Sequence, residues 1–251
     1  MLFEASNEDR LAILMRLDGE AMNVTGLSHA LGLTTQEASR HLYRLVEVGL
    51  ATRDQEGLFH LTSYGRLVLK QMSGMMFTTR HRDYFASHSH ESLPQEFLAR
   101  LGELQGSNYM GDPMVSIYRI EGIVREAEEY VWSINFPMPM SVFPILRQAF
   151  DRGVSLRLMA PKDYEVHPLI KGALSREDQD AILRAEATGL MEERFLERMD
   201  IVIWMSEREV ALIALPKPDG SFDLLGFSSE EERSHKWCWD LFQHYWERGE
   251  P

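Results

Sequence analysis

The sequence predicts a two-domain chain of the α+β or α/β class, and three observations lead to this prediction. Residues 8–72 are typical of three helices, two short strands and a further helix. Residues 115–159 alternate twice between helix and strand, which requires crossover connections and an at least partly parallel sheet. The composition changes between these two parts. We therefore expect a first domain over residues 1–73, a linker and dimerisation segment over 74–95, and a mixed α/β domain over 96–251.

The composition is typical of a soluble globular protein, with 44% hydrophobic and 26% charged residues. No apolar run approaches the ~20 residues that a membrane-spanning helix needs. Residues 1–4 contain no basic stretch leading into an apolar one, as a secretory signal would. The single cysteine, Cys238, excludes an intramolecular disulfide and fits a reducing compartment. We therefore expect a cytoplasmic protein without membrane contacts.

Acidic residues dominate the chain, but they are distributed unevenly. The net charge is −13; residues 1–75 hold seven Lys and Arg against nine Asp and Glu, a net of −2, which leaves 19 against 30 in the remainder, a net of −11. The first part therefore lacks the basic field that steers many proteins to nucleic acid. Contact with DNA would have to depend on where individual arginines lie, with an affinity that is modest and sensitive to salt.

The clearest helix signal covers residues 34–49. Thr34 and Glu37 have the spacing of a capping box, and Gly49 is placed to end the helix in a left-handed conformation. An apolar stripe at helical spacing predicts the buried face: Ala38, Leu42, Leu45 and Val46. The opposite face carries polar side chains that can contact phosphates and base edges: Gln36, Ser39, Arg40, Tyr43 and Arg44.

The elements on either side of this helix give the first domain its order. They are expected helices over residues 8–19 and 24–31, the second capped by Asn23, strands over 50–53 and 58–61 around a turn at 54–57, and a helix from about 62 to 72 that Ser73 and Gly74 end. Three helices, a hairpin and a fourth helix follow one another in a winged helix-turn-helix domain. A small helical bundle with an added hairpin is the alternative.

In a winged helix the third helix enters the major groove of DNA with its N-terminal half. The candidate base-edge contacts are then Thr35, Gln36, Ser39 and Arg40, and the candidate phosphate contacts are Tyr43, Arg44 and Arg53; the capping residue Thr34 is a further DNA-binding candidate. The plain alternative for Arg44 is a solvated helix face, and for Arg53 an ordinary charge at a strand edge.

The second domain alternates helices and strands. The expected helices cover residues 93–98, 115–127, 142–150, 176–187 and 230–247, and the expected strands cover 130–135, 154–159, 190–195, 201–205, 210–215 and 222–227. Ahead of them, His81, His88 and His90 invite a metal-site interpretation, but no clear fourth ligand and no cysteine accompany them. We therefore expect no metal and no cofactor.

Several short motifs resemble known regulators. Gly32–Thr35 before the third helix and Val48–Ala51 entering the hairpin resemble the ArsR-like winged-helix transcription factors. The second domain resembles the sensor domain of the archaeal methanogenesis regulatory (filR-type) transcription factors and the phospholipase D-like sensor fold of sugar-responsive archaeal regulators. This resemblance depends on four passages: Leu93–Pro94 with Leu101–Leu104, Arg152–Val154, Gly226–Phe227, and Trp237–Phe242 with Tyr245–Trp246. It implies a homodimer that binds double-stranded DNA and whose second domain binds a small effector.

Catalysis is not expected. Phospholipase D chemistry needs His-x-Lys-x4-Asp, with a histidine nucleophile and a lysine that holds the phosphate oxygens. The nearest match is His235, Lys236 and Asp240, where the spacing differs and the residues fall in the terminal helix. The sequence contains no P-loop, dinucleotide-binding glycine loop or nucleophile elbow.

An effector site would lie at the carboxyl ends of the parallel strands, where open α/β sheets bind ligands. The candidate residues there are Trp132, Asn135, Met138, Arg157, Met159 and His167. Trp132 and Met159 could instead be plain core residues. A buried Arg157 would need an anionic partner, either an intramolecular carboxylate or a small anionic effector.

The sequence thus predicts a homodimeric, ligand-responsive DNA-binding transcriptional regulator that is not an enzyme. Two alternatives remain open at this point. One is a protein-interaction module whose winged helix does not bind DNA, and the other is a degenerate phospholipase D-like enzyme.

Overall fold

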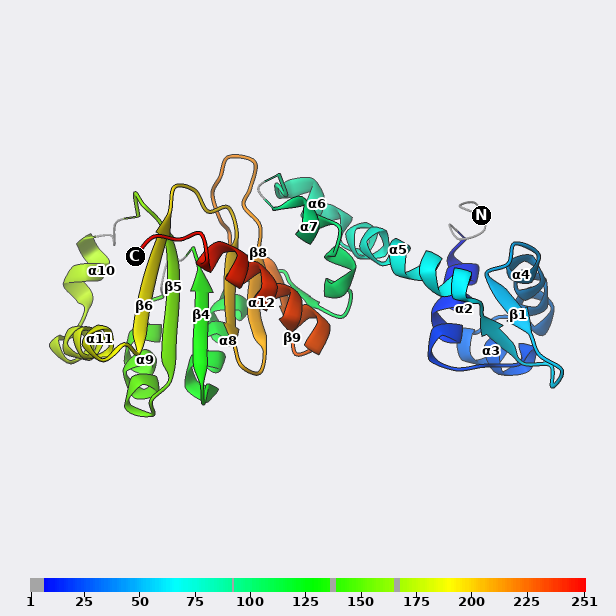
Figure 1. Ribbon diagram of the computed structural model, residues 1–251, viewed down its shortest axis with the longest axis horizontal. Helices are drawn as coiled ribbons and strands as arrows, with labels where there is room; N and C mark the ends of the chain where they lie inside the picture. Colours follow the sequence, from blue (N-terminus) through cyan, green and yellow to red (C-terminus); the bar gives the residue numbers. More distant parts are fainter. Residues whose placement is uncertain (1–6, 92, 136–138, 165–167) are drawn as a thin grey trace. The chain divides into compact units, whose positions relative to one another are not determined.

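The computed structural model describes residues 7–91, 93–135, 139–164 and 168–251. The chain divides into two compact units, Met1–Ser73 and Gly74–Pro251 (Figure 1). Both units mix helices with strands: the first holds a two-stranded hairpin and the second holds one seven-stranded sheet. Within the described ranges, no helix has the length and apolar character needed to cross a membrane.

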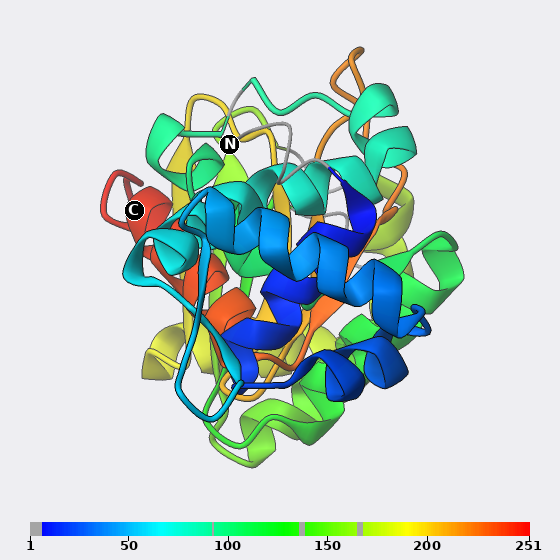
Figure 2. The same ribbon diagram turned by 90° about the vertical axis from the view of Figure 1, so that its right-hand side faces the viewer.

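The first unit consists of helices with a short hairpin at one side (Figure 2). Its elements are α2 (Glu8–Gly19), α3 (Val24–Leu31), α4 (Thr35–Glu47), β1 (Ala51–Arg53), β2 (Phe59–Leu61) and the first part of α5 (Ser63–Arg80). β1 and β2 pair antiparallel, with Ala51 opposite Leu61 and Arg53 opposite Phe59. The apolar faces of these elements meet in one core, which includes Ile13, Leu14, Leu27, Leu42, Leu45, Leu50, Phe59 and Val68. The order predicted for residues 8–61 is confirmed.

Local sequence sets the ends of these helices as expected. The Asn23 side chain accepts a hydrogen bond of 2.8 Å from the Gly26 amide, which satisfies a donor that the first turn of a helix leaves unpaired. Gly32 ends α3 with φ 67°, and Gly49 follows α4 with φ 75°. Both conformations lie in the left-handed region, which glycine adopts without the cost of a Cβ.

The predicted end of α5 at Ser73 and Gly74 is wrong, because the helix continues to Arg80. The Ser73 hydroxyl donates to the Lys70 carbonyl (2.8 Å), so its polar group is satisfied inside the helix. The Cβ position of Gly74 lies 3.6 Å from the Gly102 amide nitrogen. Glycine inside a helix costs only about 1 kcal/mol relative to alanine, a preference that tertiary packing can override.

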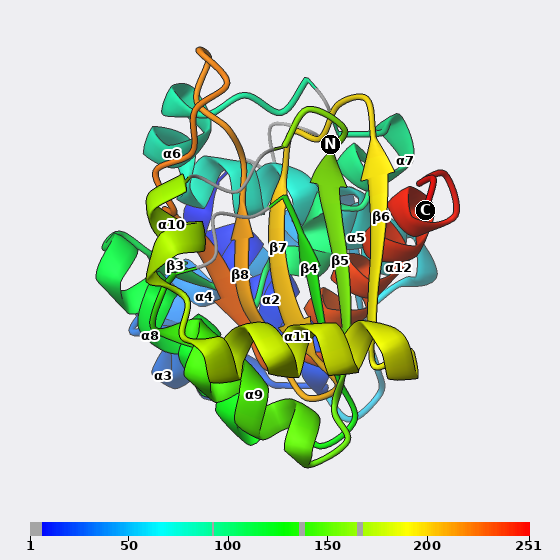
Figure 3. The same cartoon turned by 90° about the vertical axis from the view of Figure 1, so that its left-hand side faces the viewer.

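The second unit is organised around a sheet with the strand order β3-β9-β8-β7-β4-β5-β6 (Figure 3). The strands are β3 (Asn108–Met110), β4 (Tyr130–Ile134), β5 (Ser155–Pro161), β6 (Met191–Leu196), β7 (Val202–Ser206), β8 (Val210–Ala214) and β9 (Gly226–Ser229). The helices are α6 (Arg82–Ser87), α7 (Gln95–Leu98), the 3-10 helix η1 (Leu101–Leu104), α8 (Pro113–Glu126), α9 (Val142–Asp151), α10 (Pro168–Ala173), α11 (Arg176–Thr188) and α12 (Glu232–Trp246). β4, β5 and β6 pair parallel and the other pairs are antiparallel, so the predicted partly parallel sheet is confirmed.

Helices cover both faces of this sheet and create two cores. On one face α12 lies in front of the strands in Figure 1, and its Trp237, Leu241 and Phe242 join side chains from residues 77–104. The other face packs against α8 and α9, where Ile120, Val124 and Leu146 are among the buried side chains. Phe77 and Tyr84 belong to the first of these cores, so the expected linker segment packs as an integral part of the second unit.

Four details of the second unit differ from the sequence prediction. β3, α6 and α10 were not expected, and the last strand begins at Gly226 and not at Phe222. Residues 223–225 turn because the Asp223 carboxylate accepts a hydrogen bond from the Leu225 amide (3.0 Å) and Leu224 has a φ of 61°. A side-chain hydrogen bond to the local backbone thus competes with the strand.

Gly65 of α5 lies close to the backbone of Leu50, so a substitution at Gly65 tests the packing of the first unit. A Cβ at this position would lie 2.0 Å from the Leu50 carbonyl oxygen. We expect Gly65→Ala to destabilise the protein by about 3 kcal/mol, the upper end of overpacking costs, because backbone must shift to make room. Urea unfolding followed by far-UV circular dichroism measures the change. Gly19→Ala, where nothing lies within 4 Å, is the matched control. Equal midpoints for the two variants would contradict the expected clash.

Candidate nucleic-acid interface and ligand cleft

The capping box fixes the N-terminus of α4. The Thr34 hydroxyl accepts from the Glu37 amide (3.2 Å) and donates to the Glu37 carboxylate (2.7 Å), which also accepts from the Thr34 amide (2.9 Å). The predicted capping box is therefore confirmed. Because its hydroxyl is held in these bonds, Thr34 serves as the cap of α4, and its side chain is less available to a base edge than the other candidates.

The inward face of α4 holds it in the core of the first unit. Ala38, Leu42 and Leu45 are buried as predicted. His41 is also buried, which the sequence prediction missed, and its Nε2 lies 3.4 Å from Asp9 Oδ2 on α2. His41 falls three residues after Ala38 and four before Leu45, so helical spacing was the signal that could have placed it inside.

The outward face of α4 presents the polar residues that the sequence proposed for DNA. Thr35, Gln36, Arg40, Tyr43 and Arg44 are exposed, and Ser39 is half-buried. Arg40 makes no ion pair with any residue of the described chain, whereas Arg44 donates to the Glu47 carboxylate at 2.9 Å. Arg40 and Arg44 are thus balanced on this helix by Glu37 and Glu47, so the face is polar but has no excess of positive charge.

The hairpin places one arginine beside a rigid, acidic tip. The Arg53 guanidinium lies over the Phe59 ring (5.4 Å to the centroid), and Nε donates to the Gly57 carbonyl (3.4 Å). At the tip, the Asp54 carboxylate accepts from the Leu58 amide (2.8 Å) and lies 2.6 Å from His60 Nε2. The hydrogen bond from His60 lowers the pKa of the Asp54 carboxyl, so the tip stays anionic near neutral pH.

The second unit contains a cleft of about 200 Å3 at the amino-terminal ends of β4, β5 and β6. It is lined by Tyr130, Trp132, Ser155, Leu156, Arg157, Gly189, Leu190 and Glu192. In Figure 1 these are the lower ends of the three strands, which extend beyond α12. The effector site predicted from the sequence lies at the opposite, carboxyl ends of these strands, and that placement stays a prediction. The cleft forms where α12 no longer covers the sheet.

The structure separates the six residues proposed for the ligand. Trp132 and Arg157, which are opposite one another in the parallel pairing of β4 and β5, line the cleft. Asn135 and Met159 do not: the Asn135 amide donates to the Met199 carbonyl (2.9 Å), and Met159 is a core residue. Met138 and His167 lie outside the described residues.

Arg157 has an intramolecular carboxylate beside it, one of the two partners predicted from the sequence, and it also lines the cleft. Its Nε lies 3.5 Å from a carboxylate oxygen of Glu192 on β6. Its guanidinium also lies over two indole rings, 5.5 Å from the Trp132 centroid and 4.9 Å from that of Trp246. Stacking on aromatic faces holds a guanidinium in place without using its terminal N–H donors.

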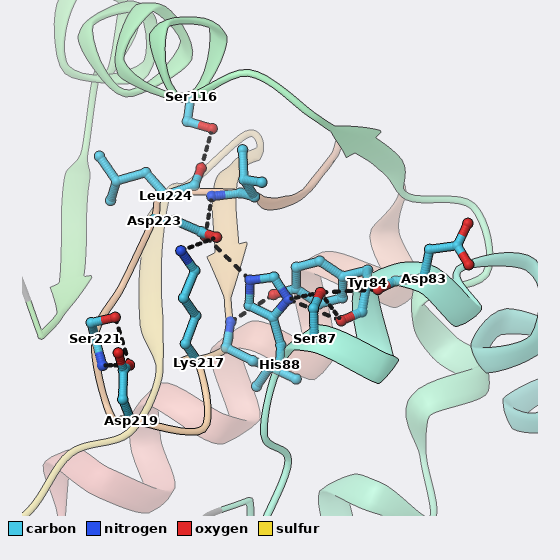
Figure 4. Close-up of polar contacts among 12 residues, drawn as sticks. Asp83, Tyr84, Ser87, His88, Ser116, Lys217, Asp219, Ser221, Asp223 and Leu224 are labelled. Atoms are coloured by element: carbon cyan, nitrogen blue, oxygen red, sulfur yellow. Dashed lines mark hydrogen bonds and ion pairs between the residues drawn. The ribbon is translucent and has the colours of Figure 1, made fainter.

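Of the three histidines in the expected linker, His88 has hydrogen-bonding partners in the second unit (Figure 4). His88 Nδ1 lies 2.9 Å from the Tyr84 carbonyl oxygen, and Nε2 lies 3.2 Å from Asp223 Oδ1. Lys217 Nζ is 3.3 Å from the other carboxylate oxygen. Burial acts to raise the pKa of Asp223, but hydrogen bonds from the Leu225 amide and His88 outweigh it, so the pKa is lowered. This cluster fixes residues 84–88 to the loop after β8. No group of three metal-ligating side chains occurs in the described ranges.

The residues nearest to a phospholipase D motif are each engaged in packing contacts. His235 Nε2 lies 2.7 Å from the Ser206 carbonyl oxygen. Lys236 donates to the Asp240 carboxylate (2.9 Å), which also accepts from Arg100 (2.6 Å). The imidazole and the ammonium therefore have intramolecular partners. His235 and Asp240 tie α12 to Ser206 and Arg100, whereas the Lys236 pair lies within α12.

Comparison with known proteins leaves the family open. No family model matches the sequence, and no curated protein matches it. Among solved structures, the chain is similar to TrmBL2, an archaeal chromatin protein, with a TM-score of 0.44, 14% identity, and coverage of 97% of this chain and 94% of that one. It is also similar to Nuc, a phospholipase D family member from Salmonella typhimurium (TM-score 0.37, 12% identity, 57% of this chain and 94% of that one). At these TM-scores the likenesses assign neither a family nor an activity, so the predicted filR-type family stays a prediction.

The capping box gives α4 a pH dependence with a definite sign. Hydrogen bonds from the Thr34 side chain and backbone lower the pKa of Glu37 below its ordinary value of 4.5. The carboxylate thus contributes stability that is present above pH 4.5 and is lost as the pH falls through the lowered pKa. We expect the α4 amides of the wild type to exchange hydrogen more slowly than those of Glu37→Gln at pH 7, with the difference shrinking as the pH falls through the lowered pKa. A difference that does not change with pH would contradict this assignment.

Proposed function

We propose that this protein is a DNA-binding transcriptional regulator whose first unit acts as a winged helix. The observation that carries the proposal is the outward face of α4. Its exposed polar side chains stand on a helix that is capped at its start and buried along its opposite side. A rigid helix of this kind can present side chains to base edges in a major groove without first becoming ordered.

The assignment of contacts follows from the docking of helix-turn-helix domains. The N-terminal part of the recognition helix reaches the bases, so Thr35, Gln36, Ser39 and Arg40 are proposed to read sequence. Tyr43, Arg44 and the hairpin residue Arg53 are proposed to contact phosphates, which position the protein on the duplex. Thr34 is proposed to act through the cap.

Two copies are proposed to bind together. With two arginines balanced by two glutamates on α4 and a single arginine on the hairpin, one copy neutralises few phosphates. A homodimer doubles the number of contacts and makes the second binding event intramolecular. This proposal keeps the homodimer that the sequence analysis predicted.

The second unit is proposed to sense a small molecule without catalysing a reaction. The cleft of β4, β5 and β6 offers aromatic walls with a few polar groups, the usual character of a ligand site. The proposal excludes phosphodiester hydrolysis because His235 and Lys236 have intramolecular partners. A phosphodiesterase assay that detects turnover lost on His235→Ala would refute this part.

Replacing the two arginines of α4 tests the proposed function directly. We expect Arg40→Ala combined with Arg44→Ala to weaken binding to promoter DNA by at least about 100-fold, because each contact to a base or phosphate contributes on the order of 1–3 kcal/mol. Electrophoretic mobility shift at fixed salt measures the change, and light scattering checks that the oligomeric state is unaltered.

The matched control removes the same charge from other helices of the first unit. Arg16 lies on α2 and Lys70 on α5, and both are exposed. Arg16→Ala with Lys70→Ala should change DNA affinity only by a few-fold. Equal losses in the two double variants would mean that charge alone matters and would remove the special role of α4.

Glu47 provides a gain-of-affinity test on the same helix. Its carboxylate pairs with Arg44 in an exposed contact, a type worth about 0–1 kcal/mol. We expect Glu47→Gln to tighten DNA binding about two- to fivefold, since it frees Arg44 and removes a negative charge facing the phosphates. The dependence of log affinity on log salt should become steeper. Unchanged affinity would indicate that Arg44 lies away from the DNA.

A second candidate function has one observation in its favour. The hairpin tip carries Asp54 and Glu56 beside its single arginine, and such a tip would repel phosphates. A winged helix used for protein interaction would tolerate this charge. DNA binding that is undetectable at 50 mM salt, about the lower end of the range in which such contacts are strong, would favour this second function.

A further inference from the structure

The cleft of the second unit has an aromatic wall of two stacked rings. Tyr130 and Trp132 lie on the same face of β4, with ring centroids 4.4 Å apart and an interplanar angle of 27°. Trp132 is buried and also stacks on Phe242 of α12 (ring centroids 4.6 Å apart, interplanar angle 22°), so the ring surface open to the cleft is that of the half-buried Tyr130. A wall of this type favours a flat ring over a flexible chain, because offset stacking on an aromatic face adds to the burial of area.

Arg157 is held at the inner side of the cleft with its terminal nitrogens unused. The Trp132 and Trp246 rings support the guanidinium, and Glu192 lies beside Nε. Neither terminal nitrogen donates a hydrogen bond to a residue of the described chain. A guanidinium fixed on its Nε side and free on its other edge matches the two oxygens of a carboxylate.

The cleft prefers anions although the Glu192 carboxylate lies beside Arg157. Its side chain is 49% exposed against 34% for Arg157, so the carboxylate is the more solvated of the two charges. A cationic ligand would have to compete with Arg157 for this carboxylate, whereas an anionic ligand meets donors that have no competitor. Burial raises the pKa of Tyr130 to about 12, so its phenol stays neutral and can donate as well.

We propose that the cleft binds a small aromatic carboxylate, with its ring against Tyr130 and its carboxylate on the free edge of Arg157. The volume of about 200 Å3 is below the ~300–1,000 Å3 of sites that enclose drug-sized ligands, which limits the ligand to about one ring. This proposal deepens the proposed sensor function by naming the class of effector. Binding at this cleft does not itself require that the protein bind DNA.

Isothermal titration of the full chain with benzoate, in the absence of DNA, tests the proposal. We expect saturable one-site binding in the millimolar range or tighter, and at least about tenfold weaker binding of benzamide, which keeps the ring and loses the charge. Cyclohexanecarboxylate, which keeps the charge and loses the aromatic ring, should also bind more weakly. Preferential binding of benzylamine would overturn the proposal, because a cation would then be the favoured ligand.

Three variants locate the binding. Arg157→Met should abolish benzoate binding, and Glu192→Gln should tighten it a few-fold by removing the nearby negative charge. Arg194→Met is the matched control: Arg194 also lies over Trp246 (4.6 Å), but it donates to the Trp246 carbonyl and does not line the cleft. This control should bind benzoate like the wild type. Thermal unfolding checks that Arg157→Met remains folded.

The outcomes separate this proposal from the proposed function. No saturable binding of benzoate at about 10 mM, or equal binding by the wild type and a folded Arg157→Met variant, overturns the ligand class. The DNA-binding assay is unaffected by either result. If Arg157→Met fails to fold, Glu192→Gln takes its place in the test. Benzoate binding by Glu192→Gln that is no tighter than that of the wild type then overturns the proposal.

Discussion

Burial of β7 and β8 on both faces is the constraint on which the second unit depends. Every residue of Val202–Ser206 and Val210–Ala214 is buried. Strands of this kind lose their stabilising apolar burial unless one layer of helices covers each face. α12 and residues 77–104 supply one layer, and α8 and α9 supply the other. The two strands therefore require that helices cover both faces of the sheet at its centre.

The cleft forms where this coverage ends. Burial falls along the sheet from β7 through β4 to β5 and β6, and Glu192 and Glu193 of β6 are exposed. Polar residues can stand there without the cost of burying an unpaired charge. Arg157 is the intermediate case, since it lies next to the aromatic side chains of the core and yet keeps one edge in solvent. Its position between the two environments gives it both a fixed orientation and free donors.

Local chemistry made much of the first unit predictable. Thr34, Glu37 and Gly49 act within one helix, so their spacing was enough to bound α4. Most strands of the second unit were likewise visible, because long apolar runs such as residues 201–205 and 210–215 have few other solutions, whereas the short β3, α6 and α10 were missed. Helical spacing placed Ala38, Leu42 and Leu45 inside but passed over His41, because a histidine is ordinarily counted as polar.

The site depended on contacts between distant parts of the chain, which spacing does not reveal. Trp132 and Arg157 were selected from the sequence and both line the cleft, but strand register brings Glu192 beside Arg157, and Trp246 comes from the last helix. The expected end of α5 at Ser73 failed for a related reason, since Gly74 packs against residues 101 and 102, far along the chain. In each case tertiary packing decided the outcome over local preference.

The balanced charge of α4 has a consequence for regulation under the proposed function. A protein with a strongly basic surface would remain on DNA through non-specific phosphate contacts whatever its sensor unit did. With Arg44 paired to Glu47 and an anionic hairpin tip, this non-specific term is small. Coupling between two sites is typically about 1–3 kcal/mol, or roughly 5- to 150-fold in affinity. An effector with a coupling of this size can move a weakly binding dimer between its DNA-bound and free states. The coupling free energy is then comparable with the free energy by which specific DNA binding is favoured.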